Sequence, residues 1–507
     1  MFDLTVIPAS GRPLPAEPFK ARHWINGVWC DSADGAVSER RSPAHDAVVS
    51  IAAKGGEAEV DAAIGAARLA FDQGDWARSA GKDRARLLLK VADLIERDIE
   101  RIALIEVLES GKPISQAKAE IEGAADIWRY AASLARVMHG DSHNSLGPDM
   151  LGLVLKEPIG VVSIITPWNF PFLIVSQKLP FALAAGCTAV GKPSELTPST
   201  TVILAELLEE AGLPKGVVNI VLGFGDPVGS IMSTDPRVDM VSFTGSTAVG
   251  KRITAAASGT LKKVSLELGG KNPQVIFPDA DLDQAADAIA FGVYFNAGEC
   301  CNSGSRVIVH EDVADALTDK VVALSRKVAF GDPLDPATQV GAIISEDHLG
   351  KIDGYVQAAK ADGASVPIGG EVLQVDGMAG RFYQPTVVTQ VRQHMPIATE
   401  EVFGPVLSVL TFRTMGEALA LANGATYGLS AGVWSKDMST CLDFTRRVQA
   451  GTVWTNTWMD GFAELPFGGV KESGSGRELG RYGLEEFLEV KTVQMRIGKT
   501  RSPWVTS

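Results

Sequence analysis

The 507-residue chain is predicted to fold as an α/β protein with two doubly wound parallel-sheet domains and a small β arm. Its length exceeds what one hydrophobic core usually supports, so more than one structural unit is expected. Two separate series of short apolar runs alternate with helical stretches, which is the pattern of parallel sheets covered by helices. Two further strand-like stretches lie outside those series. Edge strands of this kind have unpaired backbone N–H and C=O groups, which need a partner strand or a covering element. Contact with a second subunit usually provides one.

Amphipathic helices open the body of the chain. Apolar residues at helical spacing trace one stripe from Val60 to Phe71 and a second from Leu88 to Ile102, so we expect two long helices that face the core. The first α/β series follows Gly152. Its strands are expected at 161–165, 217–222 and 240–243, and its helices at 199–211 and from residue 247 onward.

The second α/β series supplies the other sheet. Its strands are expected at 274–277, 306–310, 387–388 and 406–412, with a helix at 314–328. The stretch 139–157 is rich in Gly, Asp and Ser before alternating leucines begin, which predicts a hairpin-like excursion. Residues 485–497 are predicted to form the last strand.

Domain boundaries follow from these elements. We expect one domain to comprise residues 1–138 and 159–270, with 468–484 returning to it, a second domain to comprise 271–467, and the arm to comprise 139–158 and 485–507.

Composition limits the possible partners. The 46% hydrophobic and 21% charged content is that of an ordinary globular protein. A net charge of −14 disfavours a surface that binds nucleic acid, because such surfaces are strongly basic. No uncharged apolar stretch reaches the roughly 20 residues that span a bilayer, and the N-terminus lacks a signal-peptide pattern. We therefore expect neither a nucleic-acid nor a membrane partner.

The five cysteines, at positions 30, 187, 300, 301 and 441, form an odd set without a CxxC pair. This pattern favours neither a disulfide framework nor a zinc site, and it fits a reducing compartment. His139 and His143 are four residues apart but have no third ligand nearby. We expect a cytoplasmic protein without a metal site.

Two runs offer a nucleophile and a base. Cys301 lies in the run 295–306, whose glycines at 298 and 304 leave its thiol reachable, and Glu267 lies at the end of a strand-like stretch. An isolated cysteine is more often a small buried side chain. The surrounding residues favour the nucleophile here.

Two strand ends carry polar groups that suit a ligand site, because α/β sheets bind ligands at the carboxyl ends of their strands. Asn169 follows the strand 161–165 in a turn that Pro171 stiffens, and a rigid amide can donate to an oxyanion. Lys192 and Glu195 follow the next strand. These residues also fit a structural turn and a solvated ion pair.

Two glycine-containing segments are candidates for a phosphate site. In the run 243–250 a strand ends and a helix begins, so that free backbone N–H groups and the helix dipole can face an anion. An ordinary N-capped helix explains the same run. The segment 223–229 has the spacing GxGxxxG rather than GxGxxG and contains Pro227, so by itself it is a weak fingerprint.

Taken in order, these segments resemble those of the aldehyde dehydrogenase superfamily over nearly the whole chain. The motifs that carry the resemblance are Pro167-Trp168-Asn169, Lys192-Pro193-Ser194-Glu195, Phe243-Thr244-Gly245-Ser246, Glu267-Leu268-Gly269-Gly270-Lys271, Gly298-Glu299-Cys300-Cys301, Glu400-Glu401-Val402-Phe403-Gly404-Pro405 and Pro466-Phe467-Gly468-Gly469, with Ser473-Gly474-Ser475-Gly476-Arg477-Glu478. The resemblance implies a cofactor-binding first domain, a catalytic second domain and an arm that joins subunits into a homodimer or homotetramer.

The resemblance also implies the chemistry, which is oxidation of an aldehyde to an acid with a nicotinamide cofactor. Cys301 would form a thiohemiacetal, and the Asn169 side chain with the Cys301 backbone N–H would hold the oxyanion. Glu267 would activate the water that hydrolyses the thioester, which implies a free acid as the product. Lys178 and Glu478 match positions proposed to relay the proton, although a structural ion pair is an equal alternative.

The implied cofactor residues are Ile165, Thr166, Trp168, Lys192, Ser194, Glu195, Gly225, Gly229, Thr244, Gly245, Ser246, Leu268, Glu401 and Phe403. A carboxylate at Glu195 accepts hydrogen bonds from ribose hydroxyls and would repel a 2′-phosphate, so NAD is expected over NADP.

The substrate is an aldehyde of open identity. The expected entrance residues are Phe170, Gln177, Trp458, Phe462 and Phe467. The residues around Trp458 are similar to the betaine- and aminoaldehyde-oxidising branch, but Gln177 stands where many such enzymes have an aromatic residue, so a full aromatic cage is not evident. Two alternative functions remain. One is a cofactor-independent esterase or acyl transferase that uses Cys301, and the other is a non-catalytic protein on the same fold.

Overall fold

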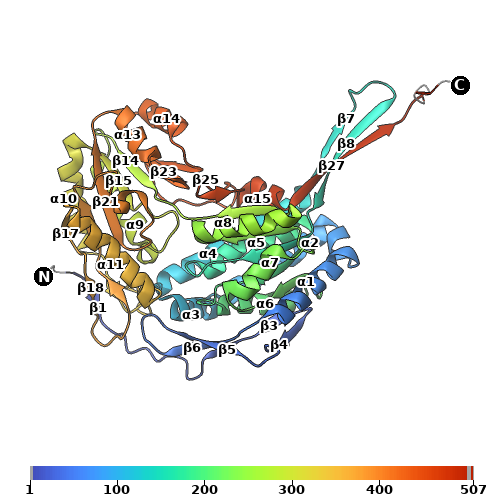
Figure 1. Ribbon diagram of the computed structural model, residues 1–507, viewed down its shortest axis with the longest axis horizontal. Helices are drawn as coiled ribbons and strands as arrows, with labels where there is room; N and C mark the ends of the chain where they lie inside the picture. Colours follow the sequence, from blue (N-terminus) through green and yellow to red (C-terminus); the bar gives the residue numbers. More distant parts are fainter. Residues whose placement is uncertain (1–3, 500–503, 506–507) are drawn as a thin grey trace.

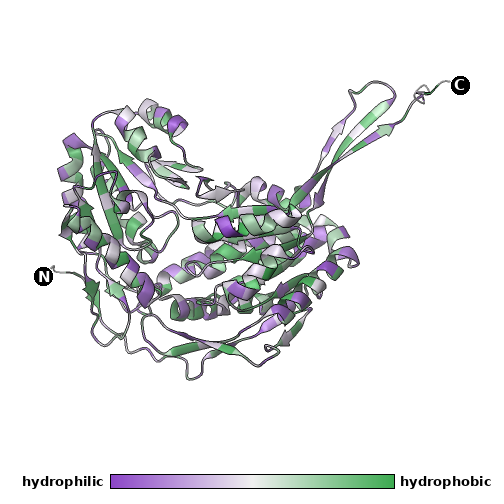
Figure 2. Cartoon of the chain, viewed as in Figure 1, coloured by the Kyte–Doolittle hydropathy of each residue, from purple (hydrophilic) through white to green (hydrophobic). Residues whose placement is uncertain are grey.

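The computed structural model describes residues 4–499 and 504–505. The chain forms two α/β units side by side, and a long β arm projects from one of them (Figure 1). The strands of both sheets are largely hydrophobic, whereas the outer helices alternate hydrophobic and hydrophilic residues (Figure 2). The predicted α/β class with two parallel-sheet units is therefore confirmed.

The first sheet has eight strands in the order β26-β13-β12-β9-β10-β11-β3-β4. Its bounds are β3 (His23–Ile25), β4 (Val28–Cys30), β9 (Val161–Ile165), β10 (Thr188–Lys192), β11 (Val218–Ile220), β12 (Met240–Thr244), β13 (Lys263–Glu267) and β26 (Gly474–Ser475). The strands from β13 to β11 are parallel, and the rest add antiparallel edges. The strand order reverses between β9 and β12, and such a reversal opens a crevice at the carboxyl ends of the strands.

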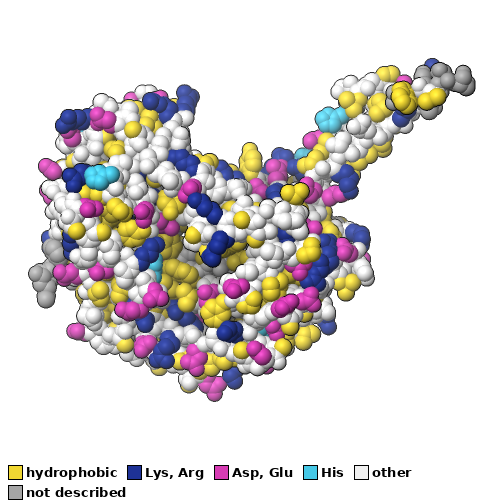
Figure 3. Space-filling model, viewed as in Figure 1, with side chains coloured by type: hydrophobic (Ala, Val, Ile, Leu, Met, Phe, Trp, Pro, Cys, Tyr) yellow, Lys and Arg dark blue, Asp and Glu magenta, His cyan; other side chains and the backbone are white. Residues whose placement is uncertain are grey.

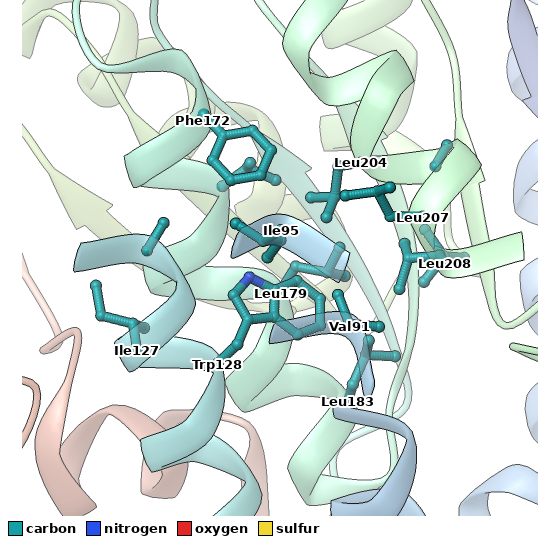
Figure 4. Close-up of a cluster of buried hydrophobic side chains, with 14 of the residues drawn as sticks. Val91, Ile95, Ile127, Trp128, Phe172, Leu179, Leu183, Leu204, Leu207 and Leu208 are labelled. Carbon is teal, nitrogen blue, oxygen red and sulfur yellow. The ribbon is translucent and has the colours of Figure 1, made fainter. Parts of the chain in front are cut away.

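Helices cover both faces of this sheet. One face carries α1 (Glu57–Asp72), α7 (Ser230–Thr234) and α8 (Thr247–Ala257), and the other carries α5 (Pro171–Ala185) and α6 (Ser199–Ala211), with α2 (Gly81–Arg97), α3 (Ile99–Ser110) and α4 (Ile114–Val137) outside them. In the core, Trp128 packs among leucine, isoleucine and valine side chains of the neighbouring helices (Figure 4). Its indole Nε1 donates to Ser176 Oγ at 3.1 Å, so the buried polar atom has a partner.

The second sheet has seven strands in the order β17-β20-β21-β15-β14-β23-β24, all parallel except β17. Its bounds are β14 (Pro273–Ile276), β15 (Arg306–His310), β17 (Ser365–Ile368), β20 (Thr386–Thr389), β21 (Val406–Phe412), β23 (Ser430–Trp434) and β24 (Thr452–Thr455). On one face lie α9 (Leu282–Tyr294), α10 (Ala314–Ser325) and α11 (Glu346–Ala361), and on the other lie α13 (Met415–Asn423) and α14 (Met438–Arg447).

The arm is an antiparallel sheet in the order β27-β8-β7. Its strands are β7 (Asp141–His143), β8 (Met150–Pro158) and β27 (Leu488–Arg496), and β8 and β27 pair in continuous register from Pro158–Leu488 to Met150–Arg496. The hairpin-like excursion and the C-terminal strand of the chain thus meet in one structure (Figure 1).

Smaller elements complete the fold. They are β1 (Val6–Ile7) with β16 (Phe330–Gly331), β2 (Phe19–Ala21) with β5 (Val37–Arg41) and β6 (Val48–Ala53), β18 (Val372–Leu373) with β19 (Phe382–Tyr383), β22 (Tyr427–Gly428) with β25 (Val470–Lys471), and the helices α12 (Pro396–Thr399) and α15 (Gly480–Glu486). Residues 6–7 therefore lie beside the second unit, because their backbone extends the edge of β16. Residues 1–3 of the predicted first domain and residues 500–503 and 506–507 of the predicted arm lie outside the residues that the structure describes.

The structure corrects two predicted elements and adds helices that were not predicted. The stripe from Leu88 to Ile102 belongs to two helices, because Asp98 leaves helical geometry with φ −102° and ψ 14°. A break of one residue keeps the apolar residues facing the same core, so their spacing does not reveal it. The last strand begins at Leu488 rather than 485, since α15 occupies the residues before it. The helices α4 and α5 were not anticipated.

Candidate active site

Two adjoining cavities lie at the strand-order reversal, and the molecule is hollowed between the two units on this face (Figure 3). The larger has a volume of about 530 Å³ and the smaller about 210 Å³. Both are lined by Pro167, Trp168, Thr244, Gly245 and Ser246. The site therefore begins at the ends of β9 and β12 and runs toward the second unit.

The expected site residues gather in these cavities. Ile165, Thr166, Lys192, Ser194, Glu195, Gly225 and Gly229 line the larger cavity, and Asn169, Glu267, Leu268, Cys301, Glu401 and Phe403 line the smaller. Residues that are up to about 240 positions apart in the sequence thus share one site. Those of the first unit end or follow strands of its sheet, whereas Cys301, Glu401 and Phe403 lie in loops that precede β15 and β21.

Backbone geometry presents Cys301. The preceding turn puts Asn296, Ala297 and Gly298 in the left-handed region, at φ 50°, 56° and 73°. The Asn272 amide Nδ2 donates to the backbone oxygens of Cys301 and Ser303 at 2.9 Å each, which fixes the loop. Cys301 is half-buried and faces the cavity, whereas the Cys300 side chain packs in an apolar cluster with Phe170.

The Cys301 thiol is held in its neutral form. A hydrogen bond with the Cys300 thiol, burial and the nearby Glu401 raise the pKa of Cys301 well above its ordinary value. Because the thiolate is the nucleophile, the thiol must lose its proton to a base as it reacts.

Glu267 has the environment of a general base. It ends β13, and only 4% of it is exposed. Among the described residues, neither of its carboxylate oxygens has a hydrogen-bond partner. Burial and the neighbouring Glu478 carboxylate raise the pKa of Glu267 well above its ordinary value, against the opposing effect of Lys178. A carboxyl group of this kind accepts protons near neutral pH.

Lys178 and Glu478 lie behind the cavities rather than in them. Lys178 Nζ donates to Glu478 Oε1 and to Ser242 Oγ, the latter at 3.1 Å. Both side chains are almost fully buried, and both act on the pKa of Glu267. The pair therefore influences Glu267 electrostatically.

Asn169 is held in place by hydrogen bonds between its side chain and backbone and the loop that precedes Cys301. Its Nδ2 donates to the backbone oxygen of Glu299 at 3.0 Å, and Asn296 Nδ2 donates to the backbone oxygen of Asn169 at 3.1 Å. An amide nitrogen carries two hydrogens, so one remains for an oxyanion beside Cys301.

The residues of the larger cavity fit a dinucleotide. Ser246 caps α8 by accepting from Val249 N at 3.4 Å, and the helix N-terminus that it begins suits a pyrophosphate. At Gly225 a side chain would meet nothing within 4 Å, which leaves room for a flat ring. Lys192 Nζ lies 3.7 Å from Glu195 Oε2, and the Glu195 carboxylate is partly exposed for a ribose.

The smaller cavity suits the reactive end of such a cofactor. Glu401 Oε1 accepts from Gly270 N at 2.9 Å, and burial raises the pKa of Glu401 to about 7. The Phe403 ring meets the Trp168 ring edge-on with 5.5 Å between centroids. Thr244 Oγ1 is buried and has no partner within the described chain, which leaves a donor for a ligand.

Sequence reasoning missed several residues that line the cavities, and three of them have basic side chains. They are His348 and Lys351 on α11 and Arg252 on α8. His348 Nε2 donates to Phe403 O at 2.7 Å, and burial lowers the pKa of His348 to about 4, so the ring is neutral. Their only sequence signal was helical spacing, which does not say which cavity a helix faces.

An apolar cluster of side chains lies next to the nucleophile. Phe170, Ile174 and Cys300 pack with Leu173, Phe295 and Met459, and the Phe170 and Phe295 rings stack with centroids 6.0 Å apart and planes 16° from parallel. Gln177 and Phe467 are half-buried, and Phe462 is exposed.

The structure separates Trp458 from this cluster. Trp458 is 4% exposed, and its ring fills the space beside Gly292, Gly304 and Gly432, whose missing side chains make room for it. The next residue, Met459, packs against the apolar cluster instead.

Known proteins match this chain over nearly its full length. The model of the aldehyde dehydrogenase family matches residues 29–493. Betaine aldehyde dehydrogenase of Bacillus subtilis is 41% identical over 96% of this chain and 99% of its own length. The human mitochondrial aldehyde dehydrogenase is 42% identical over 96% of this chain and 94% of its own.

Solved structures are also similar. An NAD-dependent aldehyde dehydrogenase from Sinorhizobium meliloti has a TM-score of 0.97 and 51% identity, covering 99% of both chains. Betaine aldehyde dehydrogenase from Staphylococcus aureus, solved in complex with NAD+, has a TM-score of 0.93 and 40% identity, covering 96% of both chains.

Proposed function

The chain belongs to the aldehyde dehydrogenase family, and we propose that its Cys301, Asn169 and Glu267 carry out the NAD-dependent oxidation of an aldehyde to a carboxylic acid. The observation that carries these roles is one cavity lined by a cysteine thiol and by a buried carboxylate without a partner among the described residues. The expected activity of the chain, NAD-dependent aldehyde oxidation, is confirmed by its family.

The first step joins Cys301 to the substrate. The thiol loses its proton as its sulfur bonds to the aldehyde carbon. Of the two carboxylates that line the cavity, Glu267 and Glu401, we assign the role of proton acceptor to Glu267, whose oxygens have no partner among the described residues. The carbonyl oxygen becomes an oxyanion, which the Asn169 amide and the Cys301 backbone N–H hold. Single donors of this kind typically contribute about 10²–10³ in rate.

NAD, when bound, would supply the hydride acceptor that converts the thiohemiacetal into a thioester. Glu401, Phe403 and His348 would hold its reactive end from the second unit, and Ser246, Lys192 and Glu195 would hold the other end from the first. We thus propose that residues 159–270 form the main part of the cofactor domain and 271–467 the catalytic domain.

Once the thiol proton has left Glu267 for solvent, Glu267 removes a proton from water, whose oxygen attacks the thioester carbon. The C–S bond breaks, the Cys301 thiolate takes up a proton, and the acid leaves. We propose that Lys178 and Glu478 support the transfer of the thiol proton from Glu267 to solvent, since both act on the pKa of Glu267.

The assembly and location of the protein are part of the proposal. We propose a homodimer or homotetramer formed through the arm, because its edge strand β27 carries exposed apolar residues. No helix in the described chain is long and apolar enough to cross a membrane. Five free cysteines support a cytoplasmic location.

Steady-state kinetics test the proposal. The protein should reduce NAD in the presence of betaine aldehyde, aminoaldehydes, short aliphatic aldehydes or benzaldehyde, and the Cys301→Ala variant should not. Turnover of an ester without cofactor, with no NADH from any aldehyde, would instead favour an acyl transferase. Activity that survives Cys301→Ala would contradict the assigned nucleophile.

A further inference from the structure

The segment before Cys301 contains a buried asparagine that the mechanism above does not use. Asn296 is only 3% exposed, and it is not among the residues that line the two cavities of the site. Its side chain therefore does not face a substrate or cofactor bound there. Any effect of Asn296 on the reaction must pass through a neighbouring residue.

Both hydrogens of the Asn296 side-chain amide are used in hydrogen bonds. Asn296 Nδ2 donates to the backbone oxygen of Asn169 at 3.1 Å and to the backbone oxygen of Glu299 at 3.0 Å. Because an amide nitrogen carries only two hydrogens, Asn296 has none left for an oxyanion. Its side chain is instead a bridge between the turn that carries Asn169 and the loop that carries Cys301.

The two asparagines share one acceptor. The backbone oxygen of Glu299 also accepts a hydrogen bond from Asn169 Nδ2, at 3.0 Å. A carbonyl oxygen has two lone pairs, and Asn169 and Asn296 together occupy both. The three residues therefore form a closed ring of hydrogen bonds, which fixes Asn169 at its backbone oxygen and at its side-chain nitrogen.

This ring sets the direction of the hydrogen that Asn169 has left. An amide group is planar, so once one N–H of Asn169 points at the Glu299 oxygen, the direction of the other N–H is determined. A donor that is oriented in advance needs no reorganisation when the oxyanion forms. Without the Asn296 side chain, Asn169 would lose one of its two attachments to the Cys301 loop.

The backbone of Asn296 is itself held in place. It has φ 50° and ψ 40°, in the left-handed region that asparagine adopts more readily than most other residues. Its backbone N–H donates to Gln116 Oε1 at 3.1 Å, and Gln116 Nε2 donates to the backbone oxygen of Gln339 at 2.7 Å. The bridge is thus anchored to α4 and to the segment around residue 339.

Resting on the proposed function, we propose that Asn296 is a positioning residue that preorganises the oxyanion donor Asn169. It touches none of the reacting atoms. Its two hydrogen bonds hold the Asn169 amide against the loop of Cys301, so that the donor and the nucleophile keep one relative position. The step that it supports is the attack of Cys301 on the aldehyde, in which the carbonyl oxygen gains its negative charge.

Asn296→Gly removes the bridge and keeps the backbone, because glycine adopts the left-handed conformation without strain. With propanal, or another aldehyde that the wild type oxidises, we expect kcat/KM for the aldehyde to fall by about 10²-fold and KM for NAD to stay within about twofold. Asn26→Gly is the matched control, since Asn26 also has a left-handed backbone, with φ 51°, but lies in the turn between β3 and β4. An unchanged kcat/KM in Asn296→Gly would overturn the proposal.

A double-mutant cycle with Asn169→Ala separates positioning from a general structural role. If Asn296 acts through Asn169, then Asn296→Gly should change kcat/KM by less than about twofold once residue 169 is Ala. An equal loss in both backgrounds would mean that Asn296 acts on the loop by itself, and the proposal would be wrong. A wild-type rate in Asn169→Ala would place the fault in the proposed function. A slow Asn169→Ala beside a fast Asn296→Gly would refute only the role of Asn296.

Iodoacetamide gives a readout that involves no oxyanion. It alkylates the Cys301 sulfur by displacing iodide, so the rate of inactivation depends on the thiol and not on Asn169. We expect iodoacetamide to inactivate Asn296→Gly and the wild type at rates within about threefold of each other. A loss as large as the one in kcat/KM would show that Cys301 itself has moved. Asn296→Ala repeats the test if the glycine loosens the loop, since the neighbouring Ala297 also has a left-handed backbone, with φ 56°.

Discussion

At the residue scale, the site is built around side chains that lack the partners which buried polar groups usually have. Glu267 ends a buried strand with both oxygens unpaired among the described residues, and Thr244 Oγ1 lacks a partner in the same cavity. An unsatisfied buried group reduces stability, and such groups persist where function needs them. The Glu267 carboxylate is therefore free to accept a proton, and the Thr244 hydroxyl is free to form a hydrogen bond with a ligand.

Replacing Glu267 should slow both halves of the reaction. In Glu267→Gln neither the Cys301 thiol nor the attacking water can give its proton to residue 267, so we expect no fast burst of NADH and a steady-state rate lower by about 10²–10⁴. In the wild type the steady-state rate should fall as pH falls through the raised pKa of Glu267, because the base must be ionised. Stopped-flow absorbance and a pH–rate profile measure both effects. Glu122→Gln, on the exposed face of α4, is the control. A full steady rate in Glu267→Gln would contradict its role as the base.

The same variant should be more stable than the wild type. Folding raises the pKa of Glu267, so the folded state holds a proton that the unfolded state has released, and stability falls as pH rises through that raised pKa. Gln at 267 does not ionise. We expect the free energy of unfolding of Glu267→Gln to exceed that of the wild type by about 1 kcal/mol or more, and the difference to grow from pH 5 to pH 8. Denaturant unfolding at both pH values checks this, and a difference that shrinks with pH would be the wrong sign.

Glu195 should govern cofactor choice. Its carboxylate lies at the larger cavity near Lys192, and a 2′-phosphate there would meet a like charge. In Glu195→Gln we expect kcat/KM with NADP to rise relative to NAD by about tenfold, since removing one repulsive charge leaves the Lys192 ammonium to attract the phosphate. Kinetics with both cofactors measure the ratio. An unchanged ratio would mean that other residues, such as Arg252, decide the preference.

At the element scale, the site depends on a close contact between two loops of the second unit. The loop before Cys301 precedes β15, and the loop of Glu401 precedes the neighbouring strand β21. A Cβ on Gly298 would lie 2.1 Å from the backbone oxygen of Gly404, and Gly298 has φ +73°. The loops can approach this closely because residue 298 has no side chain.

Gly298→Ala should therefore push the two loops apart. We expect kcat/KM for aldehyde and for NAD to fall together by about 10²-fold, because Cys301 and Glu401 would no longer keep their separation. Gly259→Ala is the matched control, since a Cβ at Gly259 meets nothing within 4 Å. Full activity of Gly298→Ala would contradict the tight contact.

At the scale of the whole molecule, two α/β units enclose the site and the arm reaches away from both (Figure 1). The nucleophile and Glu401 come from the second unit, whereas Asn169 and Glu267 come from the first. The site is complete only when the units pack together. The arm takes no part in the cavities, which leaves it available for contact with another subunit.

A charge on the arm should weaken assembly. Val490 is on the edge strand β27 and is 65% exposed. In Val490→Asp we expect a smaller particle mass at micromolar concentration, because burying an unpaired carboxylate in an interface is costly. Light scattering after size exclusion measures the mass. Leu442→Asp, on α14 in the other unit, is the control and should leave it unchanged. Identical masses for Val490→Asp and the wild type would exclude this part of the arm from the interface.

Much of the fold and of the site could be predicted from the sequence. The strands at 161–165 and 306–310 were predicted to the residue, because short apolar runs between helical stretches are a local signal. The family, and with it the expected chemistry, followed from motifs of a few adjacent residues around Asn169, Glu267 and Cys301. The roles of these residues stay predictions until the variants are measured.

Contacts between distant residues could not be predicted in this way. The break at Asp98 leaves the apolar spacing intact, and α5 is apolar on nearly every side, so its residues show no amphipathic stripe. Trp458 and Met459 are adjacent in the sequence. Trp458 fills the space that Gly292, Gly304 and Gly432 leave, so that Met459 is the residue that packs against the apolar cluster around Phe170.

The sequence by itself determined the α/β class, the strand ends that carry polar groups and the thiol and carboxylate of the reaction, because each is encoded by neighbouring residues. Only the tertiary structure decided that Glu267 has no partner among the described residues, that Gly298 touches Gly404 and that Asn296 bonds to Asn169. Burial, close approach and hydrogen bonds between loops depend on which distant residues meet in space, and that is set by how the two units pack.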